Sequence, residues 1–176
     1  MKIGFVALET FVPTKKYLEW SKLFQVEEVV SLDCALCPRI VRELPEDDNG
    51  EYQHEYGEVF TDIFSNLDWL LNKTRDLEDK QILAVVKEPK EDCARSIHLE
   101  GFQFCGYDLV EDATRISALT NCGGFDKAFL ASDLSRYGLI EDFAKAKEIQ
   151  IRLREYYPNE EHADTTRWAI WKMFIK

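Results

Sequence analysis

The stretch from 101 to 125 constrains the fold most, because it holds two extended runs joined by a four-residue connection of small and polar residues. The runs are 102–110 and 115–121, and a loop of that length is commonly built around a type I turn in a hairpin. Apolar residues occupy both faces of the first run, as in an interior strand that is covered on each side. We therefore expect a β-hairpin at the centre of a sheet, with Val110 opposite Arg115.

The rest of the chain reads as a mixture of short strands and amphipathic helices. Period-two or β-branched apolar runs predict strands at 3–8, 26–32, 81–87 and 168–175, and helical spacing predicts helices at 14–24, 65–78 and 139–157, with a short helix or loop at 125–134. A chain of 176 residues suits one core. The expected fold is a single α+β domain over 1–176, with a mostly antiparallel sheet of about five or six strands covered by three or four helices.

The overall charge restricts the partners. With 22 Lys and Arg against 33 Asp and Glu, the formal net charge is −11. Such a surface repels phosphates and anionic lipids, so we expect neither nucleic acid nor membrane as a direct partner, and a basic protein is favoured. The plainer interpretation is that the acidity maintains solubility. No apolar run reaches the roughly 18 residues of a membrane span, and the first nine residues predict a strand, so a cytoplasmic protein is expected.

Much of that charge lies in the segment 43–58, which contains seven carboxylates and no Lys or Arg. Pro45, Asn49 and Gly50 predict a turn near its tip, and such a segment is usually a solvated loop. Acidic and aromatic side chains together also make good contacts to Arg and Lys. The residues predicted to bind a partner are Glu46, Asp47, Asp48, Glu51, Tyr52 and Glu55.

The five cysteines leave a second kind of chemistry open. Cys34 and Cys37 form a Cys-x-x-Cys pair, which can be a redox site or half of a zinc site. Pro38 follows the pair, and no second paired motif supplies further ligands, so ordinary packing or a tight turn competes with both functions. Cys122 could be a nucleophile if a histidine lay beside it. We expect no cofactor, and no metal in the leading interpretation.

Two blocks of sequence carry a resemblance. The block Ile116–Phe125 (ISALTNCGGF) and the ending Trp168–Trp171 (WAIW) resemble a group of small, functionally uncharacterised bacterial proteins. That resemblance covers about 81–176 and implies no mechanism. In size and charge the chain also resembles the immunity proteins that neutralise toxins of bacterial competition systems. The second resemblance implies an inhibitor that binds a toxin directly.

Two functions of different classes follow. The first is a non-catalytic acidic binding protein, most concretely an immunity protein that neutralises a basic bacterial toxin such as a nuclease. The alternative is a small thiol or zinc-dependent enzyme that uses Cys34 and Cys37, or Cys122. The lack of a complete catalytic constellation in the sequence favours the first.

Overall fold

A computed structural model describes residues 2–33, 36–41, 62–90, 96–112, 114–124, 131–156 and 168–176, with only the backbone described for Cys122, Ala131 and 154–156. Within these ranges there are four strands, β1 (Gly4–Glu9), β2 (Lys80–Lys87), β3 (Gln103–Glu111) and β4 (Trp168–Ile175). The α-helices are α1 (Lys15–Phe24), α3 (Leu67–Lys73) and α5 (Phe143–Tyr156), and single 3-10 turns lie at Asn121–Gly123 and Ala131–Asp133.

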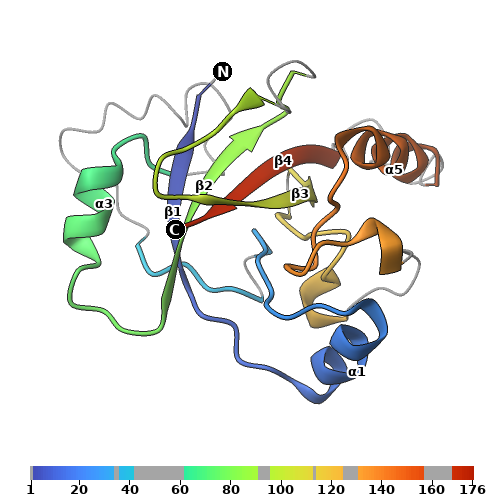
Figure 1. Cartoon of the computed structure of the whole chain (residues 1–176), viewed down its shortest axis with the longest axis horizontal. Coiled ribbons are helices and arrows are strands. Elements are labelled where there is room, and N and C mark those ends of the chain that lie inside the picture. The colour runs from blue at the N-terminus through green and yellow to red at the C-terminus, as the bar shows by residue number, and fades with distance from the viewer. Residues whose placement is uncertain are drawn as a thin grey trace.

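The strands form one antiparallel sheet in the order β1-β2-β4-β3 (Figure 1). The α+β class and the antiparallel sheet confirm the prediction from the sequence. The predicted strand and helix numbers are larger than the described part of the chain shows. β4 lies between β2 and β3, so the last strand in the sequence joins the two halves of the sheet.

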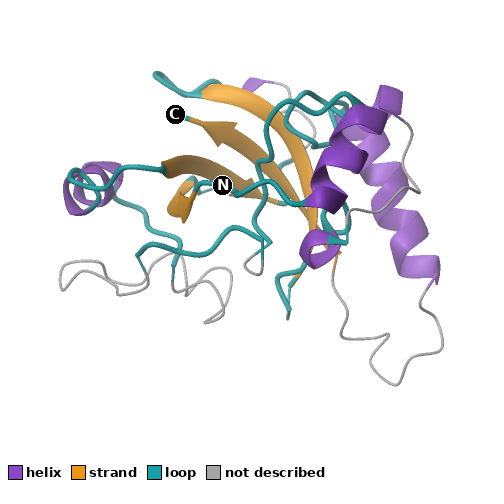
Figure 2. Ribbon diagram, turned by 90° about the horizontal axis from the view of Figure 1, so that it is seen from below, coloured by secondary structure: helices purple, strands orange, loops and turns teal. Residues whose placement is uncertain are grey.

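Alternation along the strands gives the sheet two apolar faces. One face carries Val6, Leu83, Met173 and Trp171 and packs against α1 in the main core. Figure 2 shows α3 at one end of the sheet and α5 at the other. α3 contacts β1, and α5 contacts β3 and β4. Apolar residues on both faces therefore reflect cover on both sides.

The helix boundaries have local causes. α1 begins after Thr14, whose Oγ1 accepts a hydrogen bond from the Tyr17 amide, and it ends at Gln25 in the left-handed region. α3 begins two residues after the predicted start at 65, because Asn66 rather than Ser65 caps it, and it ends at Lys73 rather than at 78. α5 begins four residues after the predicted start at 139. No helix in the described part is long and apolar enough to cross a membrane.

The predicted hairpin is wrong in its second strand. β3 forms as expected, but it pairs with β4, and it lies at the edge of the four-stranded sheet rather than at its centre. After the turn only one bridge forms, between Val110 and Ser117. Arg115 has a φ of 61°, and the Ser117 hydroxyl accepts from the Leu119 amide, so the chain turns instead of extending.

The predicted strand at 26–32 is also absent. Its amides bond to another loop instead, with Glu27 and Glu28 donating to the Arg136 carbonyl and Val30 donating to the Tyr137 carbonyl. The Val-rich composition reflects burial in the core rather than strand geometry. By contrast, the aromatic run at the end of the chain is a strand as predicted, and Trp171 is fully buried by the domain itself.

Candidate functional site

The six residues predicted to bind a partner, Glu46, Asp47, Asp48, Glu51, Tyr52 and Glu55, lie outside the described residues. What the structure places are the two ends of their segment. Before it, Arg39 bridges Leu8 of β1, and the Ile40 amide donates to the Ala7 carbonyl at 3.0 Å. After it, Phe64 exchanges two 2.8 Å hydrogen bonds with Phe5. Both ends are therefore held on the outer edge of β1, three residues apart along that strand.

A buried ionic cluster ties these ends together, and we call Arg39, Asp62 and Arg115 the clasp. Arg39 Nε contacts Asp62 Oδ2, and Arg115 donates from Nη1 to Asp62 Oδ1 at 2.5 Å and from Nη2 to Oδ2 at 3.0 Å. Arg39 also donates to the carbonyls of Leu32 and Cys37. The clasp therefore links the start of the acidic segment, its end and the turn after β3.

The chemistry of Asp62 follows from its two guanidinium partners. Asp62 is 3% exposed, and that burial by itself pushes the pKa of its carboxyl group up. The hydrogen bonds from Arg115 and the charges of Arg39 and Arg115 outweigh burial, so the pKa of Asp62 lies below its usual value. Asp62 is thus ionised at neutral pH and holds both cations in place.

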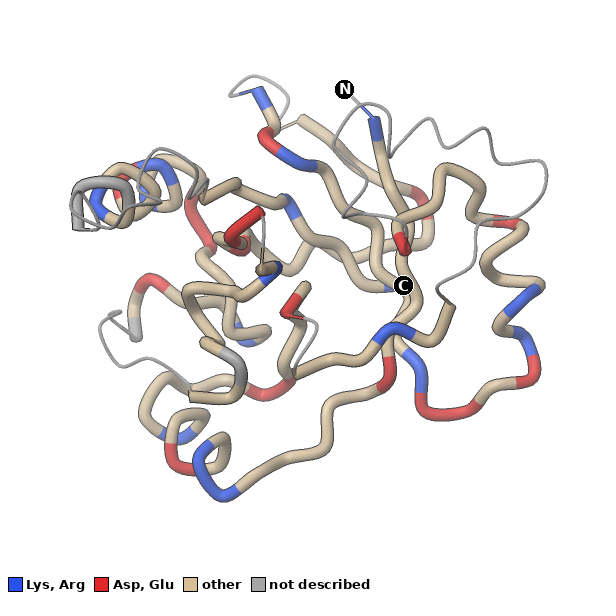
Figure 3. The backbone as a smooth tube through the Cα atoms, turned by 180° about the vertical axis from the view of Figure 1, so that it is seen from behind, with Lys and Arg blue, Asp and Glu red and all other residues tan. Residues whose placement is uncertain are grey.

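Charge is distributed unevenly along the chain. The segment 43–58 accounts for −7 of the net −11, which leaves 26 carboxylates against 22 Lys and Arg elsewhere, or −4. In the described part, acidic and basic positions are interspersed along the backbone (Figure 3). Most of the net negative charge is therefore concentrated in the one segment that the clasp delimits.

The cysteines that the structure describes are not activated thiols. Cys37 is fully buried, and burial raises the pKa of its thiol to about 12. Burial likewise raises the pKa of Cys105 to about 12. A buried thiol of this kind is a poor nucleophile, because nucleophilic attack needs the thiolate. Cys34, Cys93 and the side chain of Cys122 lie outside what is described. Within the described ranges, His, Cys, Asp and Glu form no cluster of three suited to a metal ion.

Two buried carboxylates form a hydrogen-bonded network that the sequence did not single out. Asp108 Oδ1 accepts from Ser117 Oγ at 2.5 Å, and its Oδ2 accepts from Ser31 Oγ at 3.3 Å. Thr120 Oγ1 donates to Asp33 Oδ2 at 3.2 Å. Burial raises the pKa of Asp108 to about 6 despite these bonds. The network joins 31–33 and 117–120 to β3, and its residues line neither of the cavities described below.

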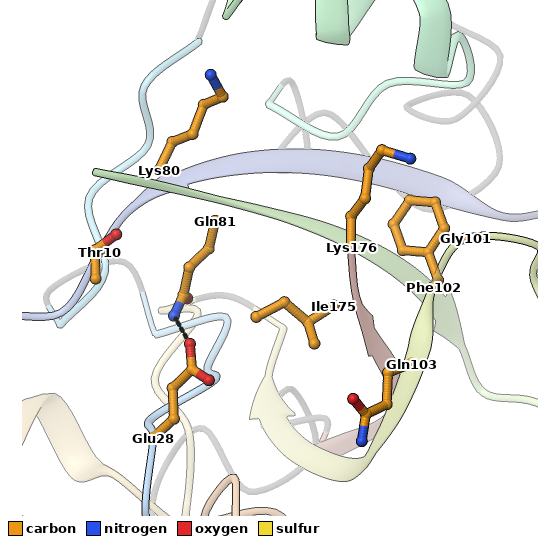
Figure 4. Close-up of a pocket in the computed structure, with 9 residues that line it drawn as sticks. All are labelled: Thr10, Glu28, Lys80, Gln81, Gly101, Phe102, Gln103, Ile175 and Lys176. Carbon is orange, nitrogen blue, oxygen red and sulfur yellow. Dashed lines mark hydrogen bonds between the residues drawn. The ribbon is translucent and has the colours of Figure 1, made fainter. Parts of the chain in front are cut away.

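The larger cavity, of about 610 Å³, lies where β4 stops short between β2 and β3. β4 pairs with β2 only as far as Ile175 opposite Leu83, so the first residues of β2 extend beyond it. We call this opening the notch (Figure 4). Glu28 and Gln81 line it on one side of the sheet, and the lysines at 80 and 176 point to the other side.

Polar groups in the notch are arranged by the alternation of the strands. Gln81 Nε2 donates to Glu28 Oε1 at 2.9 Å and to the Val29 carbonyl at 3.4 Å. Across the sheet, Lys80 Nζ donates to carbonyls after α3, and Lys176 Nζ lies 5.2 Å from the Phe102 ring centroid. The ammonium groups are thus held away from the carboxylate.

A smaller cavity of about 310 Å³ lies between β3, β4 and the start of α5. Lys172 lines it, with Nζ 4.9 Å from the Phe104 ring centroid and 5.1 Å from that of Phe174. Nζ also donates to the Ile97 carbonyl at 3.3 Å. Burial lowers the pKa of Lys172, and the two ring faces stabilise its ammonium form.

Sequence reasoning missed the clasp, the buried carboxylates and the notch for different reasons. Asp108 interrupts an otherwise apolar strand, and that signal could have marked it as a buried acid. Asp62 and Arg115 are 53 residues apart, and no pattern pairs them. The notch brings together the ends of three strands, so it can be predicted only when the strand order is known.

Comparisons with family models, curated proteins and solved structures gave no match.

Proposed function

We propose that this chain is an acidic binding protein for a basic protein partner, of the kind that neutralises a basic bacterial toxin. The observation that carries the proposal is the position of the clasp. Arg39, Asp62 and Arg115 hold the two ends of the segment with seven of the excess carboxylates at one edge of the sheet. The proposal rests on charge, on these anchors and on the resemblance in size and charge to immunity proteins.

The physical basis is electrostatic complementarity. Carboxylates concentrated in one segment of the chain raise the encounter rate with a basic surface, and the effect decreases steeply with salt. A basic nuclease would then meet carboxylates where its substrate presents phosphates, and occupation of that surface is inhibition.

The test is affinity capture from the native cell lysate with salt-stepped elution. The expected result is one basic protein, retained stoichiometrically at low salt and released as salt rises, whose activity falls when this chain is added. The matched bait is the variant E46Q/D47N/D48N/E51Q, which should lose that protein.

A second bait controls for net charge. The variant E19Q/D76N/E78Q/E100Q removes four carboxylates that are exposed elsewhere on the described surface. It should retain the partner. Equal loss from both baits would assign the interaction to diffuse charge and remove the acidic segment from the interface. Retention of a neutral or acidic protein by all three baits would contradict the proposal.

The thiol alternative has no feature of the described residues in its favour. Cys37, one member of the Cys-x-x-Cys pair, is buried with a raised pKa, which opposes thiolate chemistry at neutral pH.

A further inference from the structure

A chain of four side-chain contacts joins two buried carboxyl groups. Asp33 and Asp108 are both fully buried, and three hydroxyl groups connect them. Starting from Asp33 Oδ2, the contacts lead to Thr120 Oγ1 at 3.2 Å, on to Ser31 Oγ at 3.3 Å, to Asp108 Oδ2 at 3.3 Å, and from Asp108 Oδ1 to Ser117 Oγ at 2.5 Å. We call these five residues the relay.

The number of hydrogen atoms in the relay depends on its protonation state. Each of the four contacts needs one hydrogen between two oxygens, and each hydroxyl supplies one, so the three hydroxyls fill only three contacts. When both carboxyl groups are ionised they only accept, and the Thr120 and Ser31 hydroxyls donate to them, which leaves the contact between these two hydroxyls without a hydrogen. One added proton completes the set, because Asp108 then donates to Ser31, Ser31 to Thr120 and Thr120 to Asp33.

The surroundings of Asp108 favour it as the place for that proton. Burial raises its pKa to about 6, and the negative charge of Asp33 acts in the same direction. Within the described residues, the other ionisable groups on this side are the Cys37 thiol, which burial keeps protonated with a pKa of about 12, and Arg39, which is held in the clasp. β4 places Trp171 opposite Asp108. The proton is therefore bound at low pH and lost as the pH rises through about 6.

The relay supports both arginines of the clasp. The Leu32 amide donates to Asp108 Oδ2 at 3.4 Å, and the Leu32 carbonyl accepts from Arg39 Nη2 at 2.7 Å. On the other side, Arg115 lies two residues before Ser117, in the turn that the Ser117 hydroxyl fastens to Asp108. A relay that loses one of its bonds therefore supports the clasp less firmly from both directions.

We propose that the relay is a pH-sensitive switch, in which one buried proton closes all four contacts and its loss opens the contact between Ser31 and Thr120 and loosens the clasp. The proton leaves to solvent, and no other group changes its charge. The switch sets how firmly the two ends of the acidic segment are held, and it does not depend on the identity of a partner.

The experiment is an NMR titration of the folded, carbon-13- and nitrogen-15-labelled full chain from about pH 5 to about pH 8. The carboxyl carbon signals of Asp33 and Asp108 report where the proton is bound. The Arg39 Nε–H signal reports the clasp, through its protection from exchange with water relative to free arginine at the same pH. Asp62 stays ionised across this range, because its pKa is depressed. We expect one proton to titrate at Asp108, with a loss of Arg39 protection of about fivefold over the same interval, equivalent to one neutral hydrogen bond.

Two substitutions of Thr120 separate the relay from the effect of burial alone. Thr120→Val removes the hydroxyl, and with it a bond from Ser31 that exists only in the protonated form. The titration midpoint of Asp108 should therefore fall by about half a unit to one unit. Thr120→Ser keeps the hydroxyl and should leave the midpoint unchanged.

A third variant fixes the relay in its closed form. In Asp108→Asn the side-chain NH₂ group can donate to Ser31 as the protonated carboxyl group would, so the protection of Arg39 should no longer vary with pH over this range. If thermal unfolding shows that Thr120→Val does not fold, the wild type and Asp108→Asn decide the question by themselves.

Four results would overturn the switch. These are equal Asp108 midpoints in Thr120→Val and Thr120→Ser, a fall in Thr120→Val that is matched by proton uptake at Asp33, Arg39 protection that is constant with pH in the wild type, and a pH-dependent change that persists in Asp108→Asn. Each of them leaves the proposed basic partner untouched, because the partner is tested through the carboxylates of the acidic segment.

Discussion

Asp108 sets the clearest expectation at the scale of one residue. Burial raises its pKa from 3.8 to about 6, because Ser117 and the Leu32 amide offset only part of the desolvation. The folded state therefore binds the proton more tightly than the unfolded state. Its contribution to stability is fully present below about pH 4 and is lost as the pH rises through 6. The loss amounts to about 3 kcal/mol for a shift of that size.

The test is urea unfolding of the wild type and Asp108→Asn between pH 4 and 7. In Asp108→Asn the side-chain amide oxygen can take the place of Oδ1 and accept the same hydrogen bonds from Ser117 Oγ and the Leu109 amide. The unfolding free energy of Asp108→Asn, relative to that of the wild type, should increase as the pH rises. The contribution of Asp62 to stability has the opposite pH dependence. It is lost as the pH falls, and only at lower pH, because the pKa of Asp62 is depressed. Parallel pH profiles of the two proteins would show that Asp108 is not the group that titrates.

Asp62 in the clasp gives a second prediction, which concerns the stability of the protein. Asp62→Ala leaves Arg39 and Arg115 buried without their shared carboxylate, and breaking a buried pair typically costs about 3–5 kcal/mol. The matched control is Asp76→Ala, which removes the exposed partner of Arg75 and should cost no more than about 1 kcal/mol. Denaturant melts of both variants measure the difference. Similar losses in the two variants would mean that the clasp is no more than a surface pair.

At the scale of the element, Gly106 explains how β3 can lie against the loop that precedes α5. Its φ is 139°, it lies at the register shift between Phe104 and Gly106, and an added Cβ would be 2.7 Å from Leu139 Cβ and 2.8 Å from the Ile140 carbonyl oxygen. Gly106→Ala should therefore destabilise the protein by about 2 kcal/mol or more.

Gly101→Ala is the control for that substitution. Gly101 also has a positive φ, 74°, but its nearest neighbour would be Lys176 Nζ at 3.5 Å. Only backbone strain of about 1–2 kcal/mol is expected there. Thermal unfolding compares the two. If Gly101→Ala were as costly as Gly106→Ala, conformation rather than close approach would account for both.

The individual strands and helices show how far a sequence pattern can predict this fold. β1, α1, β2, β3 and β4 follow from periodicity and composition, since each has a buried face that repeats at the right spacing. The segments at 26–32 and 115–121 do not, because their burial comes from packing of irregular backbone. There the side-chain bonds of Ser117 and the loop carbonyls of 136–137 replace a strand ladder.

At the scale of the whole molecule, the candidate site depends on information that no local pattern contains. The acidic composition of 43–58 is visible in the sequence, whereas the clasp that holds its ends depends on Arg115, far along the chain. The notch depends on β4 entering between β2 and β3. Charge predicts the class of partner, and topology places the anchors of the segment that would meet it.

The most direct measurement is the association rate with the captured partner as a function of salt. It compares the wild type with E46Q/D47N/D48N/E51Q and with E19Q/D76N/E78Q/E100Q. The segment variant should associate about tenfold or more slowly at low salt and with a flatter salt dependence, while the control variant should stay close to the wild type. Equal slowing of the two variants, or no slowing of either, would contradict the claim that the acidic segment steers a basic partner.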